Sequence, residues 1–303
     1  MRSDPCTYIR CEGEGFTIIT VWVDDLLLFM TLDALMEKTK QNISTEWETT
    51  DLREPSKIIS IEITQSANTI SIGQQQYVEA ILKCEGMDCM NPVVMPLDPG
   101  TPILPNLDGN EGNRSNSYAC LLRELQFLVN ATCPDISYTV SRLASYTANP
   151  SMQHMGMLKR ILHYLKGTKE YGITYQARAS HNNNLFHGFA DAAYANCDNY
   201  KSTSGYVFLV ASGAITWRSK KQTVVALSST EAEYVALSEA RCEACWLRNL
   251  SEELRFPQDE PTELKGDNMG AIAMARNPQF HKCSKHIATK WHWICDLIQY
   301  GIV

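Results

Sequence analysis

The chain has 303 residues, of which 44% are apolar and 20% are charged, and this composition predicts a globular protein of at least two domains. The net charge of −7 argues against a protein that simply coats nucleic acid, because phosphate binding needs a concentrated positive surface. Eleven cysteines at irregular spacing, without a secretory signal, predict reduced thiols and an intracellular location, in the cytoplasm or the nucleus. No apolar run reaches the roughly 18 residues of a membrane span, so no membrane partner is expected.

Two apolar, β-rich runs near the N-terminus, residues 16–23 and 26–30, are separated by Asp24 and Asp25. This pattern predicts a β-hairpin with adjacent carboxylates at its tip. Adjacent aspartates are often only turn formers. The apolar flanks nevertheless place this pair at the edge of a buried sheet, where two carboxylates can hold the catalytic metal ions of a nucleotidyl transferase.

The next part of the chain predicts a second hairpin and a helix. Alternating residues over 57–63 and 69–72 favour two strands, and residues 74–83 favour a helix. Residues 91–117 are rich in Pro, Gly and Asn, which is typical of a linker or an extended loop. A second break, at residues 177–184, precedes the C-terminal part of the chain.

Three strands are predicted at residues 185–191, 204–210 and 214–217, and the turn-rich segments between them indicate an antiparallel meander. A helix is predicted over 231–250, a short strand over 261–267 and a further helix over 268–276. A strand reached through a helical crossover can pair in parallel. We therefore expect a mixed sheet in which the fourth strand lies beside the first.

Three acidic residues stand out in this region: Asp191 ends the first strand, Glu233 lies in the long helix, and Asp267 ends the last strand. At about 100° per residue, Glu233 lies on the inward stripe of the helix, opposite a polar face that includes Ser238 and Arg241. A charged carboxylate on a buried stripe needs a cation. Carboxylates at the carboxyl end of a sheet favour Mg²⁺ or Mn²⁺, and two such ions about 4 Å apart can clamp the reacting oxygens of a phosphodiester.

Each of these acids also has an ordinary structural explanation. Asp191 could end a strand, Glu233 could complete a capping box with Thr230, and Asp267 could begin a turn or cap the next helix. Taken together these explanations are weaker, because a capping box does not account for Glu233 on the buried stripe.

Several motifs in order along the chain resemble the Pol polyprotein of copia-type LTR retrotransposons. The resemblance to its ribonuclease H domain rests on residues 189–195, 201–206, 217–222, 226–234 and 267–268. Residues 21–25 resemble the Tyr-Val-Asp-Asp box of reverse transcriptases, with Trp22 in place of the tyrosine. Residues 51–55, 61–63, 76–78 and 95–98 resemble the palm, and residues 123–130, 134–138 and 162–171 resemble the thumb and connection helices.

The resemblance implies an α/β fold in three parts: a truncated α+β reverse transcriptase palm at 1–112, thumb and connection helices at 113–177, and a ribonuclease H-like mixed-sheet domain at 178–303. It implies cleavage of the RNA strand of RNA–DNA hybrids, with Asp191, Glu233 and Asp267 as catalytic ligands of Mg²⁺ or Mn²⁺. It also implies polymerase catalytic residues at Asp24 and Asp25, of which Asp24 binds metal.

The same resemblance places a set of polar and basic residues beside the nucleic acid. By pattern alone, such basic groups are more often solvated surface. The set comprises Lys201, Ser202, Arg218, Lys220, Lys221, Lys285 and His286. The partners implied are an RNA–DNA hybrid or another nucleic acid and, for a fragment of this kind, an intact reverse transcriptase subunit.

Two departures from the family bear on activity. Ala288 stands where the family has a fourth carboxylate, so we expect weakened or lost hydrolysis. The residues before Asp24 leave no room for an upstream metal-binding aspartate and the fingers, so polymerisation by this chain alone is not expected. Three hypotheses remain open: a ribonuclease H-type endonuclease, a catalytically degenerate nucleic-acid-binding module, and a chain whose first half is too incomplete to fold.

Overall fold

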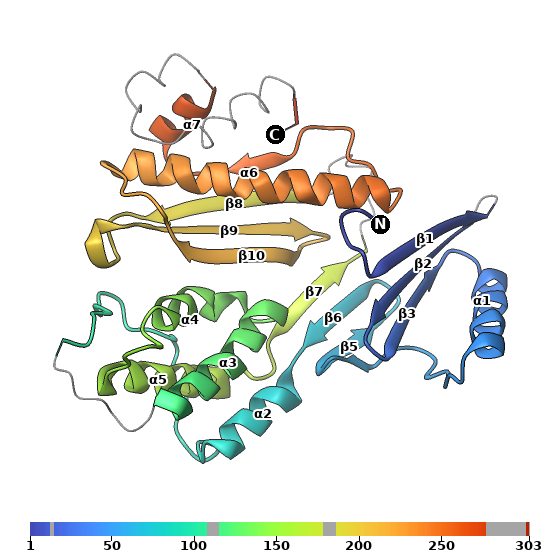
Figure 1. The fold of residues 1–303 in the computed structure, drawn as a ribbon, viewed down its shortest axis with the longest axis horizontal. Coiled ribbons are helices and arrows are strands. Elements are labelled where there is room, and N and C mark those ends of the chain that lie inside the picture. The colour runs from blue at the N-terminus through green and yellow to red at the C-terminus, as the bar shows by residue number, and fades with distance from the viewer. Residues whose placement is uncertain (13–14, 108–114, 178–185, 277–300, 303) are drawn as a thin grey trace.

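The structure is a computed structural model that describes residues 1–12, 15–107, 115–177, 186–276 and 301–302 (Figure 1). Within these residues the strands form three sheets, which are N-terminal, central and C-terminal in chain order, and the helices pack against them. The expected α/β fold class is confirmed. No helix in the described ranges is long and apolar enough to cross a membrane.

The N-terminal sheet is antiparallel, with the order β1 (Thr7–Glu12), β2 (Gly15–Trp22) and β3 (Asp25–Met30). The predicted hairpin is confirmed, because Trp22 pairs with Asp25 and leaves Val23 and Asp24 as a two-residue turn. Helix α1 (Asp33–Glu46) packs beside β2 and β3, but none of its residues is buried.

The expected burial fails at the tip of this hairpin, although Thr17 and Ile18 of β2 are buried. Trp22 is 55% exposed and Val23 is 83% exposed, and Asp24 and Asp25 are exposed as well. The reason is that, among the described elements, α1 is the one that packs extensively on this sheet from outside it. The apolar pattern specified the strands but not whether anything covers them.

The central sheet is antiparallel, with the order β4 (Lys57–Ile58), β5 (Ile61–Gln65), β6 (Thr69–Gly73) and β7 (Gly172–Gln176). The second predicted hairpin is formed by β5 and β6. Strand β7 joins β6 from a distant part of the chain. A Cβ atom on Gly172 would lie 2.4 Å from the carbonyl oxygen of Ile72, so this close pairing requires glycine.

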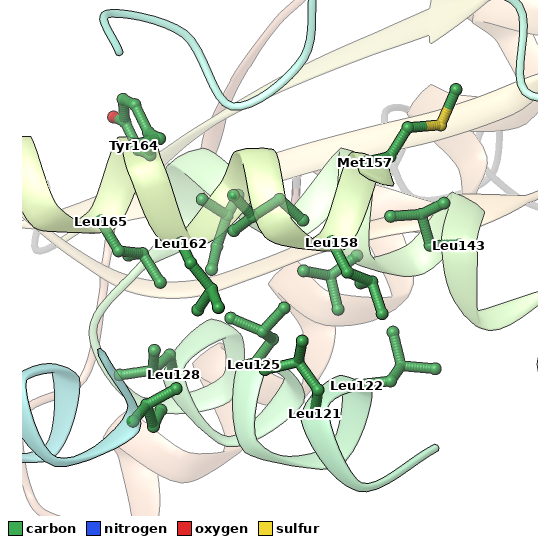
Figure 2. Close-up of a cluster of buried hydrophobic side chains, with 14 of the residues drawn as sticks. Leu121, Leu122, Leu125, Leu128, Leu143, Met157, Leu158, Leu162, Tyr164 and Leu165 are labelled. Carbon is green, nitrogen blue, oxygen red and sulfur yellow. The ribbon is translucent and has the colours of Figure 1, made fainter. Parts of the chain in front are cut away.

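A helical cluster follows the central hairpin and shares one hydrophobic core; it consists of α2 (Gln75–Cys84), α3 (Ser115–Ala131), the 3-10 helix η1 (Pro134–Ile136), α4 (Ser137–Ala144) and α5 (Met152–Thr168). Figure 2 shows leucines of α3 opposite leucines of α5 in this core. Leu125, Leu128, Leu158 and Leu162 are fully buried. Each such side chain stabilises the fold by about 1.5–3 kcal/mol, so the cluster is a stable base for η1 and α4.

The C-terminal sheet has the order β10 (Gly213–Lys221), β9 (Thr203–Val210), β8 (Phe186–Ala193) and β11 (Glu263–Lys265). The predicted meander and the parallel pairing of the fourth strand with the first are both confirmed. Helix α6 (Ser229–Glu253) packs on β8 and β9, and α7 (Met269–Arg276) packs on α6. Helix α4 packs against β10, so the sheet lies between α6 and the helical cluster (Figure 1).

The long helix α6 is buried over more of its surface than its pattern indicates. Ala240 and Ala244, on the predicted inward stripe, are fully buried. Ser238 and Arg241, expected on a polar face, are buried too. Their burial is tolerated because the Ser238 hydroxyl donates to the Tyr234 carbonyl oxygen and Arg241 Nε donates to the Ser238 carbonyl oxygen.

The division of the chain at residues 112 and 177 stays a prediction. Contacts cross the first boundary, since β6 pairs with β7 and α2 packs on α5. The central and C-terminal sheets are also joined, because the Tyr175 hydroxyl of β7 donates to the Ala214 carbonyl oxygen of β10 at 2.7 Å.

Candidate metal centre

Asp191 lies on the face of β8 that points away from α6. Phe186 and Ala190 pack in the core beneath α6. Because side chains alternate along a strand, Phe189 and Asp191 lie on the opposite face. Asp191 is exposed, and its Oδ1 accepts a hydrogen bond from the backbone N–H of Ala192 at 2.8 Å.

Glu233 lies near the start of α6 and is 7% exposed, in agreement with its predicted place on the inward stripe. Its Oε1 accepts from the backbone N–H of Ala192 at 3.2 Å. The same N–H donates to Asp191, so one backbone group of β8 orients both carboxylates.

The N-terminus of α6 is capped by other residues. The Ser228 hydroxyl accepts from the backbone N–H of Glu231, and the Glu231 carboxylate accepts from the backbone N–H of Leu227. The explanation of Glu233 as the capping-box partner of Thr230 is therefore wrong. The capping requirement of this helix is met without Glu233, whose carboxylate is directed to β8 instead.

Asp267 follows the end of β11, and it does not cap the next helix. Asn268 does so, because its Oδ1 accepts from the backbone N–H of Ala271 at 3.0 Å. Strand β11 runs parallel to β8, so both strands end at the same edge of the sheet. This topology brings the exposed Asp267 next to Asp191.

The three carboxylates converge: one oxygen from each of Asp191, Glu233 and Asp267 lies within 4.8 Å of the others. The pKa of the Glu233 carboxyl is raised to about 7, chiefly by burial and in part by the neighbouring Asp191 and Asp267, while the hydrogen bond from Ala192 opposes the shift. A buried carboxylate beside two others is costly to ionise unless a cation is present. Three carboxylate donors fit a hard divalent ion such as Mg²⁺ or Mn²⁺.

A groove of about 940 Å³ opens beside this centre, and Asp191 and Asp267 line it. One wall is the open face of the C-terminal sheet. The other wall comes from the helical cluster, through residues of η1 and the start of α4 that include Asp135 and Tyr138. Both are held in place: Asp135 Oδ2 accepts from the Tyr164 hydroxyl at 2.5 Å, and the Tyr138 hydroxyl accepts from Asn196 at 3.0 Å.

Sequence reasoning missed this second wall and two residues of the first, Phe189 and Lys265, which also line the groove. No local signal could have found the second wall, because η1 and α4 are far from the sheet in the sequence. Phe189 and Lys265 did carry a signal. Each lies two positions before a predicted metal ligand, which is the spacing of side chains on one face of a strand.

Of the described residues predicted to contact nucleic acid, some line the groove and others lie outside it. Arg218 lines the groove. Lys220 is exposed and Lys221 is half-buried, and neither is part of the groove lining. Lys201 donates to the Thr223 carbonyl oxygen. Lys285 and His286 lie outside the described residues.

The Ser202 side chain points into the protein, and its predicted contact with nucleic acid stays a prediction. It is fully buried, and its hydroxyl accepts from the backbone N–H of Ala195 at 3.0 Å. The physical reason is local: the loop before β9 turns back on itself, and the Ser202 hydroxyl satisfies a backbone donor of that loop.

Asp24 and Asp25 do not form a comparable cluster. Both are exposed on the hairpin of the N-terminal sheet. Among the residues that the structure describes, the one group of three or more potential metal-ligating side chains is that of Asp191, Glu233 and Asp267.

Comparison with known proteins identifies relatives of this chain. The family described as reverse transcriptase (RNA-dependent DNA polymerase) matches residues 3–99. The Retrovirus-related Pol polyprotein from transposon RE1 of Arabidopsis thaliana is 33% identical over 300 residues, which are 99% of this chain and 20% of that protein. A putative transposon Ty5-1 protein of Saccharomyces cerevisiae is 30% identical over 235 residues, which are 77% of this chain and 75% of that protein. The chain thus spans about a fifth of the length of the plant polyprotein.

A solved structure shares the fold. The foamy viral protease-reverse transcriptase, determined in complex with an RNA/DNA hybrid, superimposes with a TM-score of 0.52 at 15% sequence identity. The match covers 92% of this chain and 34% of the foamy viral chain.

Proposed function

Because the chain belongs to the reverse transcriptase family, as represented by the Pol polyproteins of copia-type retrotransposons, we propose that it hydrolyses the RNA strand of RNA–DNA hybrids at the centre formed by Asp191, Glu233 and Asp267. The observation that carries the proposal is the convergence of these carboxylates within 4.8 Å at the edge of a groove of about 940 Å³. The foamy viral protein of the same fold was solved with an RNA/DNA hybrid, which supports this choice of substrate.

The residues of the centre have distinct tasks in this reaction. Mg²⁺ or Mn²⁺, when bound, supplies the positive charge that stabilises the attacking water and the leaving oxygen. Asp191 and Asp267 present ligand oxygens to the groove. Glu233 adds a buried oxygen, whose cost of ionisation falls when a cation is near. The backbone N–H of Ala192 holds Asp191 and Glu233 in a fixed orientation by donating to both.

Substrate recognition follows from the groove walls. Hybrid duplexes are recognised largely by shape, 2′-hydroxyls and phosphates rather than by base sequence. Arg218 supplies a cation in the groove lining, and Tyr138 supplies an aromatic surface on the opposite wall. The exposed Lys220 extends the positive charge beyond the groove along β10.

A second candidate function is a binding module that grips the hybrid without cutting it. The observation that favours it is Ala288, which stands where the family has a fourth carboxylate and lies outside the described residues. RNA-directed DNA polymerisation by this chain is not part of the proposal. Asp24 and Asp25 are exposed on a hairpin and join no third acidic or metal-ligating side chain among the described residues.

The test is cleavage of an RNA–DNA hybrid, labelled on the RNA strand, by the full chain in Mg²⁺ and then in Mn²⁺. Asp191→Asn removes a ligand charge and should reduce the single-turnover rate at least about a hundredfold, which corresponds to about 3 kcal/mol. Asp24→Asn is the matched control, since it makes the same chemical change at the other candidate acid and should leave the rate unchanged.

Hybrid binding by fluorescence anisotropy separates the two candidate functions. Binding without cutting by the unmodified chain would favour the binding module, and restoration of cutting by Ala288→Asp would then identify the missing carboxylate as the cause. Cutting that survives Asp191→Asn would overturn the proposed centre.

A further inference from the structure

Two residues without a part in the proposed hydrolysis, Phe189 and Lys265, lie next to the metal centre on the same two strands. Phe189 of β8 is paired in register with Lys265 of β11. Asp191 follows Phe189 by two positions, and Asp267 follows Lys265 by two positions. Two residues span roughly 6.6 Å along a strand. Phe189 and Lys265 therefore form a row of side chains immediately before the row of carboxylates, and all four residues line the groove.

The chemistry of this row suits a nucleotide. Phe189 is 39% exposed, although it belongs to a strand whose other face is fully packed. Lys265 Nζ lies 5.4 Å from the centroid of the Phe189 ring. An aromatic face accepts a base or a sugar regardless of sequence, and an ammonium group binds phosphate. The two groups that a nucleotide requires are thus adjacent.

The ammonium group of Lys265 can exchange its carboxylate partner for a phosphate. Its partner in the structure is Glu263, at 3.2 Å, and both side chains are about half exposed. Exposed ion pairs of this kind contribute little to stability, so a phosphate can replace the carboxylate. Among the described residues that line the groove, Lys265 and Arg218 are the two cations, beside the aspartates Asp135, Asp191 and Asp267. A polyanion entering this acidic groove depends strongly on those two cations.

We propose that Phe189 and Lys265 form a nucleotide subsite for the strand cut at the metal centre. The Phe189 ring packs against the sugar or base of the nucleotide next to the scissile phosphate, and Lys265 binds the neighbouring phosphate. The subsite rests on the proposed function, because a strand held at Asp191 and Asp267 with its scissile phosphate passes over this row. It adds substrate positioning, which the carboxylates alone do not provide.

The experiment measures hybrid affinity by fluorescence anisotropy over a series of salt concentrations, in the full chain carrying Asp191→Asn so that no cutting occurs. Adding Phe189→Leu should weaken binding about tenfold at every salt concentration, because one stacking contact is lost. Adding Lys265→Gln should lower the slope of log Kd against log salt by about 0.7 to 0.9, because one phosphate contact is lost.

Matched controls and a second aromatic variant keep the test decisive. Tyr171→Leu and Lys83→Gln remove an exposed aromatic ring and an exposed ammonium group away from the groove, and should change neither affinity nor slope. Phe189→Trp should restore the affinity lost in Phe189→Leu. A purely structural role for Phe189 would lower the thermal midpoint in Phe189→Leu and leave Kd unchanged, and would overturn the subsite.

The outcomes also separate the subsite from the proposed function. Unchanged affinity and slope in both variants, with a parent chain that binds the hybrid and cuts it when Asp191 is restored, overturn the subsite alone. Weakened binding with no cutting by the unmodified chain supports the subsite and overturns hydrolysis. A parent chain that does not bind hybrid overturns both.

Discussion

The N-terminal and C-terminal sheets both carry carboxylates at strand ends, but they offer those carboxylates very different surroundings. The C-terminal sheet has α6 on one face and helix α4 against β10 on the other side, and its acids come from β8, α6 and the turn after β11. The N-terminal sheet has α1 beside it, and its two acids are neighbours on one hairpin. In the C-terminal sheet, three elements meet at one edge and bring three carboxylates together. In the N-terminal sheet, a single hairpin presents two exposed carboxylates.

The difference shows that adjacency in sequence is a poor guide to a metal centre. Asp24 and Asp25 are consecutive, yet no third acid joins them among the described residues. Asp191, Glu233 and Asp267 are widely separated in sequence, and the parallel pairing of β11 with β8 together with the crossover helix α6 unites them. Mutations in the two regions test whether they differ as much in stability and electrostatics as they do in packing.

The largest expected effect is the loss in the free energy of unfolding when a buried side chain is truncated. Phe208 of β9 is fully buried, whereas Phe29 of β3 is 50% exposed. Phe208→Ala should lower the free energy of unfolding by about 3–5 kcal/mol, because it leaves a cavity between the sheet and α6. Phe29→Ala should cost about 1 kcal/mol or less. Urea unfolding followed by circular dichroism measures both, and equal losses would show that the N-terminal sheet is covered in solution.

A smaller effect on stability is expected from ionisation of the Glu233 carboxyl. It is measured in the presence of a chelator, which keeps metal ions from the centre. Glu233 has a pKa raised to about 7 in the folded chain, above its unfolded value, so the folded state binds this proton more tightly. Stability should therefore fall as the pH rises from about 4.5 to about 7 and then level off. Glu233→Gln removes the ionisation and should stabilise the chain by about 3 kcal/mol at pH 8 and hardly at all at pH 4.5.

The matched control for this prediction is Glu252→Gln, an exposed residue on the same helix, which should change stability little at either pH. The measurement is the thermal midpoint across the pH range. An equal gain from Glu233→Gln at both pH values would show that the carboxylate cluster is not the source of the destabilisation.

The smallest effect concerns the turn of the N-terminal hairpin. Val23 adopts a φ of 51°, a region that is strained for a β-branched residue, and it is 83% exposed. Val23→Gly should relieve this strain without losing packing and raise the free energy of unfolding by about 0.5–1 kcal/mol. Chemical denaturation tests the prediction, and a loss of stability would mean that Val23 packs against something in solution.

Much of the site could be predicted from local pattern. The alternation in β8 and the inward stripe of α6 identified Asp191 and Glu233 as residues on particular faces, and the strand–helix–strand order predicted the parallel pairing that brings Asp267 to them. The burial of the Ser202 and Arg241 side chains could not be predicted from local pattern. Their side chains are buried by neighbouring segments, and pattern does not reveal which polar groups find partners in the folded chain.

The sequence by itself determined the strands and helices around Asp24, Asp191, Glu233 and Asp267 and the three candidate metal ligands, because the strand period of two and the helix period near 3.6 are local properties of the chain. It did not predict β1, α1 or β7. Tertiary structure alone decided which surfaces are covered. It left Trp22 exposed, paired β7 with the distant β6, and brought η1 and α4 to the sheet as the second wall of the groove. Each of these depends on contacts between segments far apart in sequence, and the periodicity of one segment contains no information about the partner that packs on it.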